Sequence, residues 1–100
     1  MHVISLKALR EFWRVHSSAE KPMRAGHTAT EKAAWSNFAD VRLTFNTADL
    51  VDEFVVFDVG GNKYRIVTMV MYEAKRVYVR EVFKHAEYDA WSKTQRRRKR

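Results

Sequence analysis

The second half of the chain alternates between strand-like stretches and short polar turns, and this pattern limits the possible folds most. The stretches, rich in β-branched and aromatic residues, are Phe54 to Val59, Lys63 to Tyr72 and Arg76 to Phe83. Gly60-Gly61-Asn62 separates the first two, and glycine tolerates the positive φ angles of tight hairpin turns. Strands joined by such short turns pair antiparallel, so the pattern predicts a three-stranded meander.

The N-terminal residues predict a short strand and then a helix. His2 to Ile4 has the apolar character of a strand. After Ser5, a possible N-cap, apolar residues recur at helical spacing until Ser17 and Ser18 break the pattern; they are Leu6, Leu9, Phe12 and Trp13.

A second helix is expected from about Ala29 to about Ala39. Thr28 and Glu31 have the spacing of a capping box, and apolar residues continue one face beyond them. Residues 40–53 lack a clear period, so we expect a loop there, with a short strand near Arg42 to Phe45.

These elements predict an α+β fold in which two N-terminal helices cover one face of a small antiparallel sheet. A short C-terminal helix is expected after His85. One hundred residues are enough for one domain, which we place at residues 1–92, with a basic tail at 93–100.

Composition excludes several classes of site. The chain has no cysteine, which rules out disulfides and thiolate metal sites and favours a reducing compartment. The four histidines lack metal-ligand spacing, and no phosphate-binding glycine loop is present. No apolar run approaches the roughly 20 residues that span a bilayer. We therefore expect a soluble, cytoplasmic protein with no membrane partner, metal or cofactor.

The positive charge is concentrated at the C-terminus. The formal net charge is +7, yet residues 1–90 are nearly neutral, and six of the last ten residues are Lys or Arg. Such a run attracts phosphate polymers through counterion release. We expect Arg96, Arg97 and Arg98 to bind RNA; a solubilising or expression-derived tail is the alternative.

Arg65 and Arg80 lie inside strands that are otherwise largely apolar. A strand arginine is costly unless it is paired or lines a wet groove, and the possible partners are Asp58, Glu73 and Glu81. Further polar residues lie at the ends of the strands, namely Lys63, Lys84, His85 and Tyr88. Together they predict a cradle for a phosphodiester, because RNA cleavage requires proton transfer and positive charge beside the phosphate.

Four segments of the chain resemble the HigB type of toxin in the RelE superfamily. The most specific are FDVGGNKYRIV, from Phe57 to Val67, and VYVREVFKHAEYD, from Val77 to Asp89. The opening residues, His2 to Trp13, and the segment from Ala39 to Phe54 are also similar. The resemblance implies a compact RelE-like fold and a metal-free, ribosome-dependent endoribonuclease that cleaves mRNA in the A site and so inhibits translation. It also implies a helix-turn-helix antitoxin of the HigA kind, a heterotetramer with it, and operator DNA bound only through that complex.

The resemblance also implies roles for individual residues. Arg65 would hold the scissile phosphate, and His85 would transfer a proton. Lys84 and Tyr88 complete the catalytic set. Lys63 would bind RNA through its phosphate or assist the base, and Arg80 would bind RNA or brace the sheet. Asn46 departs from the family, whose members often have proline there. Two alternatives remain open: a non-catalytic RNA-binding module, and a degenerate toxin that acts only in an autorepressor complex with its antitoxin.

Overall fold

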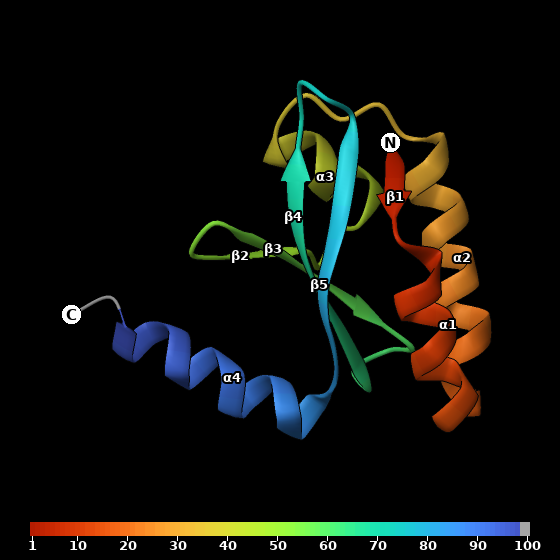
Figure 1. Cartoon of the computed structure of the whole chain (residues 1–100). Helices are drawn as coiled ribbons and strands as arrows, with labels where there is room; N and C mark the ends of the chain where they lie inside the picture. The colour runs from red at the N-terminus through yellow and green to blue at the C-terminus, as the bar shows by residue number, and fades with distance from the viewer. Residues whose placement is uncertain (99–100) are drawn as a thin grey trace.

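The computed structural model describes residues 1–98, with side chains as far as Gln95. It contains a five-stranded mixed sheet in the order β1-β5-β4-β3-β2, with helices on both sides (Figure 1). The predicted α+β class is therefore confirmed. No helix within residues 1–98 combines the length and apolar character needed to cross a membrane.

The central strands form the predicted antiparallel meander. They are β3 (Phe54–Val59), β4 (Tyr64–Met71) and β5 (Arg76–Lys84). The turn between β3 and β4 has φ angles of 65° at Gly60 and 66° at Gly61, which explains the two glycines. The register places Asp58 opposite Arg65 and Tyr64 opposite Lys84.

Two short edge strands complete the sheet. The predicted strand β1 (His2–Ile4) pairs with β5, and the pairing is parallel. The other edge, β2 (Asp49–Val51), pairs antiparallel with β3 and lies in a segment that we expected to be a loop. The predicted antiparallel sheet thus gains one antiparallel edge strand that was not expected, and it departs from antiparallel pairing only at β1.

The predicted second helix was placed wrongly. After α1 (Leu6–Val15) and a 3₁₀ turn at Ser17–Ala19, α2 already runs from Glu20 to Lys32. Pro22 fits because it is the third helical residue, where a backbone N–H would have no partner within the helix. Glu31 does not cap a helix start; its carboxylate accepts a hydrogen bond from the Val3 backbone N–H at 2.7 Å.

The expected strand near Arg42 to Phe45 is also wrong, because α3 occupies Phe38–Thr44. Asn37 is its N-cap, and the side-chain oxygen of Asn37 accepts from the Asp40 backbone N–H at 3.0 Å. This local hydrogen bond starts a helix where apolar periodicity alone was uninformative.

The main core lies between the sheet and helices α1 and α2. Its members include Trp13, Met23, Trp35, Phe57 and Tyr64, all at most 7% exposed. This packing fixes which face of each strand turns toward the helices, and therefore which side chains reach the opposite face.

The opposite face of the sheet is crossed at one end by α4 (His85–Arg98) (Figure 1). Trp91 anchors this helix, with ring centroids 5.5 Å from Phe54 and 6.0 Å from Phe83. The C-terminal helix is thus confirmed, but it is longer than expected and continues into the basic segment. The side chains of Arg96, Arg97 and Arg98 lie outside the described residues.

Candidate active site at one end of the sheet

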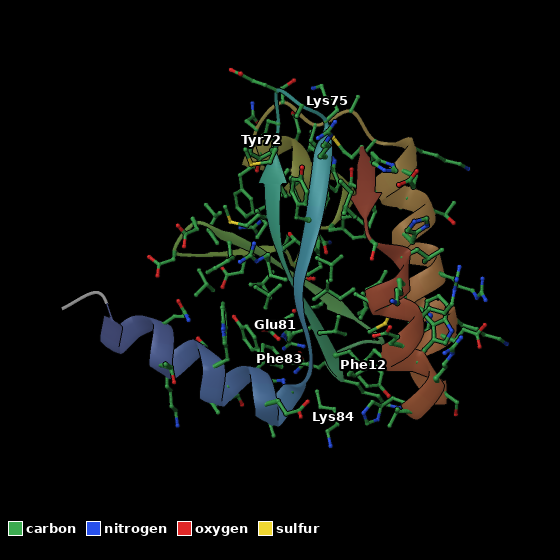
Figure 2. The ribbon with its side chains drawn as sticks, in the orientation of Figure 1. Phe12, Tyr72, Lys75, Glu81, Phe83 and Lys84 are labelled. Carbon is green, nitrogen blue, oxygen red and sulfur yellow. The ribbon has the colours of Figure 1, made fainter. Side chains whose placement is uncertain are left out.

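Three segments of the chain meet at one end of the sheet: the hairpin turn, the end of β5 and the start of α4. The His85 backbone N–H donates to the Lys63 carbonyl oxygen at 3.0 Å, and Lys84 lies opposite Tyr64 in the register. Lys63, Lys84 and His85 are all exposed. Figure 2 shows Lys84 at this end, far from Tyr72 and Lys75 at the other. The structure therefore gathers three predicted site residues on one small surface.

Arg65 lies behind this surface and is 7% exposed. Its Nε is 2.8 Å from Asp58 Oδ1, so Asp58 is the partner among the three possible acids. Its Nη2 donates to Asn62 Oδ1 at 2.6 Å, and its Nη1 donates to the carbonyls of Asn62 and Tyr64 at 3.3 and 3.2 Å. Most of the guanidinium donors are thus engaged inside the protein.

Tyr88 joins α4 to this buried arginine. Its ring centroid is 5.5 Å from the Arg65 guanidinium carbon and 5.9 Å from the Trp91 ring. Arg65 therefore contacts both the hairpin turn and the terminal helix. Loss of the Arg65 side chain would remove contacts to both segments of the site.

The first turn of α4 orients His85. Its Nε2 is 3.3 Å from Asp89 Oδ2, one helical turn further on, and 46% of its side chain is exposed. The Glu87 carboxylate accepts from the Lys84 backbone N–H at 2.9 Å and so fixes the start of the helix. The imidazole is held in orientation while its ring stays open to a substrate. Among residues 1–98, no three His, Asp or Glu side chains cluster as a metal site would require.

Arg80 lies away from this end, at a β-bulge. Val67 pairs with Glu81 and Thr68 with Val79, so Arg80 is the extra residue between them. Regular alternation along β5 would place Tyr78, Arg80 and Val82 on one face, but the bulge shifts the alternation of the strand. Arg80 is exposed and precedes Lys84 in β5, away from the end of the strand where Lys63, Lys84 and His85 gather.

The β4–β5 register beyond the bulge divides the cations of the site between two faces of the sheet. Lys84 shares the face of Tyr64, which packs toward α1, whereas Arg65 pairs with Phe83 on the face of α4. The cations therefore lie around the end of the sheet, on both of its faces.

Sequence reasoning missed the residues that position the site. The spacing of His85 and Asp89, four apart at the start of a helix, could have indicated their contact. The role of Asn62 carried no such signal, because turn composition explains an asparagine there without any reference to Arg65.

Comparison with known proteins identifies the class to which this fold and site belong. Residues 19–91 match a family described as the RelE-like toxic component of a toxin–antitoxin system. The chain is also similar to the mRNA interferase toxin HigB of Escherichia coli K12, with 31% identity over 99 residues, 96% of this chain and 95% of that protein. The mRNA interferase HigB of Escherichia coli O6:H1 is 26% identical over 102 residues, 99% of each chain. The chain belongs to the HigB toxin family, as the sequence resemblance predicted.

Proposed function

We propose that this protein is the toxin of a toxin–antitoxin pair and an endoribonuclease that cleaves mRNA. The observation that carries the proposal is the meeting of Lys63, Lys84 and His85 at one end of the sheet. The related proteins named mRNA interferases support the substrate class. In finer detail, we propose cleavage in the ribosomal A site, in the cytoplasm, without a metal ion or cofactor.

The proposed reaction is a transesterification within the RNA. The ribose 2′-oxygen loses its proton and bonds to phosphorus, and the bond to the 5′-oxygen breaks as that oxygen takes up a proton. His85 transfers a proton, with its ring held by Asp89. The ammonium groups of Lys63 and Lys84 stabilise the negative charge that develops on the phosphate oxygens.

Arg65 and Tyr88 support these exposed groups from behind. For direct contact with the scissile phosphate, Arg65 would use its remaining Nη2 donor or exchange its hydrogen bond with Asn62. The charge of its guanidinium acts on the phosphate in either case, reduced by its ion pair with Asp58. Tyr88 orients the substrate, and Arg80 and the tail residues Arg96, Arg97 and Arg98 bind RNA outside the reacting group.

The partner in this proposal is a helix-turn-helix antitoxin of the HigA kind. The toxin and antitoxin form a heterotetramer that binds operator DNA through the antitoxin. Covering the exposed cations at the sheet end would exclude RNA, which gives neutralisation a simple physical basis.

The test is induced expression in bacteria without antitoxin, combined with 5′-end mapping of mRNA. The wild-type protein is expected to arrest growth and produce new cuts in translated frames, and His85→Ala is expected to abolish both. His2→Ala is the matched control, because His2 is exposed and pairs with Arg76 at the opposite end of the sheet; it should retain full toxicity.

Normal growth and intact messages in cells that contain folded wild-type protein would contradict the nuclease proposal. RNA binding by that inactive protein would favour a binding module. Binding to antitoxin alone would favour a degenerate toxin. Cleavage of free mRNA at the same rate as ribosome-bound mRNA would contradict ribosome dependence only.

A further inference from the structure

The proposed reaction needs two proton transfers, and the site described so far contains one histidine. One group must take the proton of the 2′-hydroxyl, and another must give a proton to the 5′-oxygen. Two of the other histidines are poorly placed: His2 lies at the opposite end of the sheet, and His27 is 3.8 Å from Glu31 within α2. His16, at the C-terminal end of α1, is the remaining one.

His16 lies in a cluster of aromatic side chains at the same end of the sheet as His85. Its ring centroid is 4.5 Å from that of Phe12 and 6.4 Å from that of Tyr64. Phe12 also packs edge-on against Tyr64 at 5.5 Å, and the Tyr64 hydroxyl shares a hydrogen bond with Ser18 Oγ. These contacts fix the His16 ring, and the residue is half-buried. Within the described residues, His16 has no carboxylate partner.

Tyr64 connects this cluster to the gathered cations. It lies opposite Lys84 in the β4–β5 register, and opposed residues place their side chains on the same face of a sheet. Lys84 therefore projects beside Tyr64 toward α1. Figure 2 shows Phe12 and Lys84 at this same end of the molecule. The next residue, His85, starts α4, so Lys84 connects the aromatic cluster around Tyr64 to His85 along the chain.

We propose that His16 is the second proton-transfer residue of this site, acting as the general base while His85 acts as the general acid. The inference rests on the proposed nuclease function. Neutral His16 takes the 2′-hydroxyl proton as the 2′-oxygen bonds to phosphorus. Protonated His85, beside the Asp89 carboxylate, gives its proton to the departing 5′-oxygen. The products are a 2′,3′-cyclic phosphate and a 5′-hydroxyl, with one proton gained by His16 and one lost by His85.

The contacts of the two rings differ. The His16 ring packs against the rings of Phe12 and Tyr64, and no carboxylate of the described residues pairs with it. His85 Nε2 lies 3.3 Å from Asp89 Oδ2. We assign the acid role to His85 because a carboxylate orients its ring, and the base role to His16 because none does.

The experiment is the pH dependence of single-turnover mRNA cleavage on programmed ribosomes. The wild-type rate should rise and then fall with pH, because the base must be neutral and the acid protonated. His16→Gln should lower the rate by about 100-fold or more and remove the rising limb. His85→Gln should remove the falling limb instead. Phe12→Leu, which alters the same packing without removing a titratable group, should keep both limbs.

His16→Ala provides a second variant, and added imidazole should restore part of its rate. An unchanged rate and profile in His16→Gln would overturn the inference and leave the proposed function intact. A slower rate with both limbs retained would also overturn it, because a merely structural role predicts that result. Absence of cleavage by the wild-type protein would instead contradict the proposed function itself.

Discussion

The ion pair between Arg65 and Asp58 allows a quantitative test of how the site is held. Asp58→Ala removes the carboxylate 2.8 Å from Arg65 Nε and leaves a guanidinium whose side chain is 9% exposed. Removing one partner of a buried pair costs about 3–5 kcal/mol. The Arg65 guanidinium keeps its bonds to Asn62 and Tyr64, and the Asp58 side chain is a quarter exposed. We therefore expect the lower end, about 3 kcal/mol.

The assay is urea unfolding with a double-mutant cycle. A loss of about 3 kcal/mol corresponds to a fall of about 15 °C in Tm for a domain of this size. The double variant Asp58→Ala with Arg65→Met should recover much of this loss, because it leaves no unpaired buried charge. Asp58→Asn is the near-isosteric comparison, and it should cost less than the alanine variant.

A loss below about 1 kcal/mol in Asp58→Ala would refute this reasoning, because that is the range of solvent-exposed ion pairs. Arg65 would then be free to leave Asp58 and bind phosphate directly. The stability measurement therefore also decides between two roles for Arg65 in the proposed reaction.

Four further predictions concern stability and RNA binding. Gly26→Ala should stabilise the protein by about 0.5–1 kcal/mol, read as a higher Tm, because Gly26 lies inside α2 and an added Cβ has open space around it apart from one methyl carbon at 3.9 Å. Gly60→Ala should instead lower the free energy of unfolding by about 1–2 kcal/mol, since its φ is +65° and an added Cβ would lie 3.1 Å from an aromatic carbon; an unchanged urea midpoint would contradict this. Burial, and secondarily the Asp40 carboxylate, raise the pKa of Tyr72 above its ordinary value of 10.0. The neutral hydroxyl of Tyr72 therefore contributes to the free energy of unfolding fully below pH 10.0, and this contribution is lost as pH rises through the folded pKa. Tyr72→Phe should flatten the decline in urea midpoint above pH 10.0. Deleting residues 96–100 should reduce the magnitude of the salt slope of RNA binding by as much as about 3, whereas an equal slope would make the tail incidental.

The central meander was predictable because its information is local. The turns are short, the glycines mark the positive φ angles, and each strand pairs with its neighbour in sequence. The edge strands depend on their pairing partners, so β2 was missed and the parallel pairing of β1 with β5 was not predicted.

The second helix was placed wrongly because several residues near it can have more than one structural role. Proline and glycine are typical of loops, yet Pro22 is tolerated in the first turn of α2 and Gly26 lies in its interior. The pattern of Thr28 and Glu31 suggested a helix start, whereas Glu31 bonds to the backbone of β1. The role of Glu31 becomes clear only from its tertiary contact with Val3.

The residues of the candidate site were largely named from the sequence, and their roles remain predictions. Lys63, Lys84 and His85 do lie together, because the hairpin and the start of α4 meet. The division of Lys84 and Arg65 between two faces of the sheet depends on the β4–β5 register, which the sequence alone does not determine.

The parallel pairing of β1 with β5 has a consequence for how the chain folds as it is synthesised. β1 is made first, yet its partner strand ends at Lys84, so this edge can form only when most of the chain is available. Closing so long a loop is slow compared with forming the local hairpins. The segment that joins β1 to α1 thus gains its final position late, and so does α1, whose C-terminal end carries His16. A nascent chain therefore completes the proposed site only when its synthesis is nearly finished.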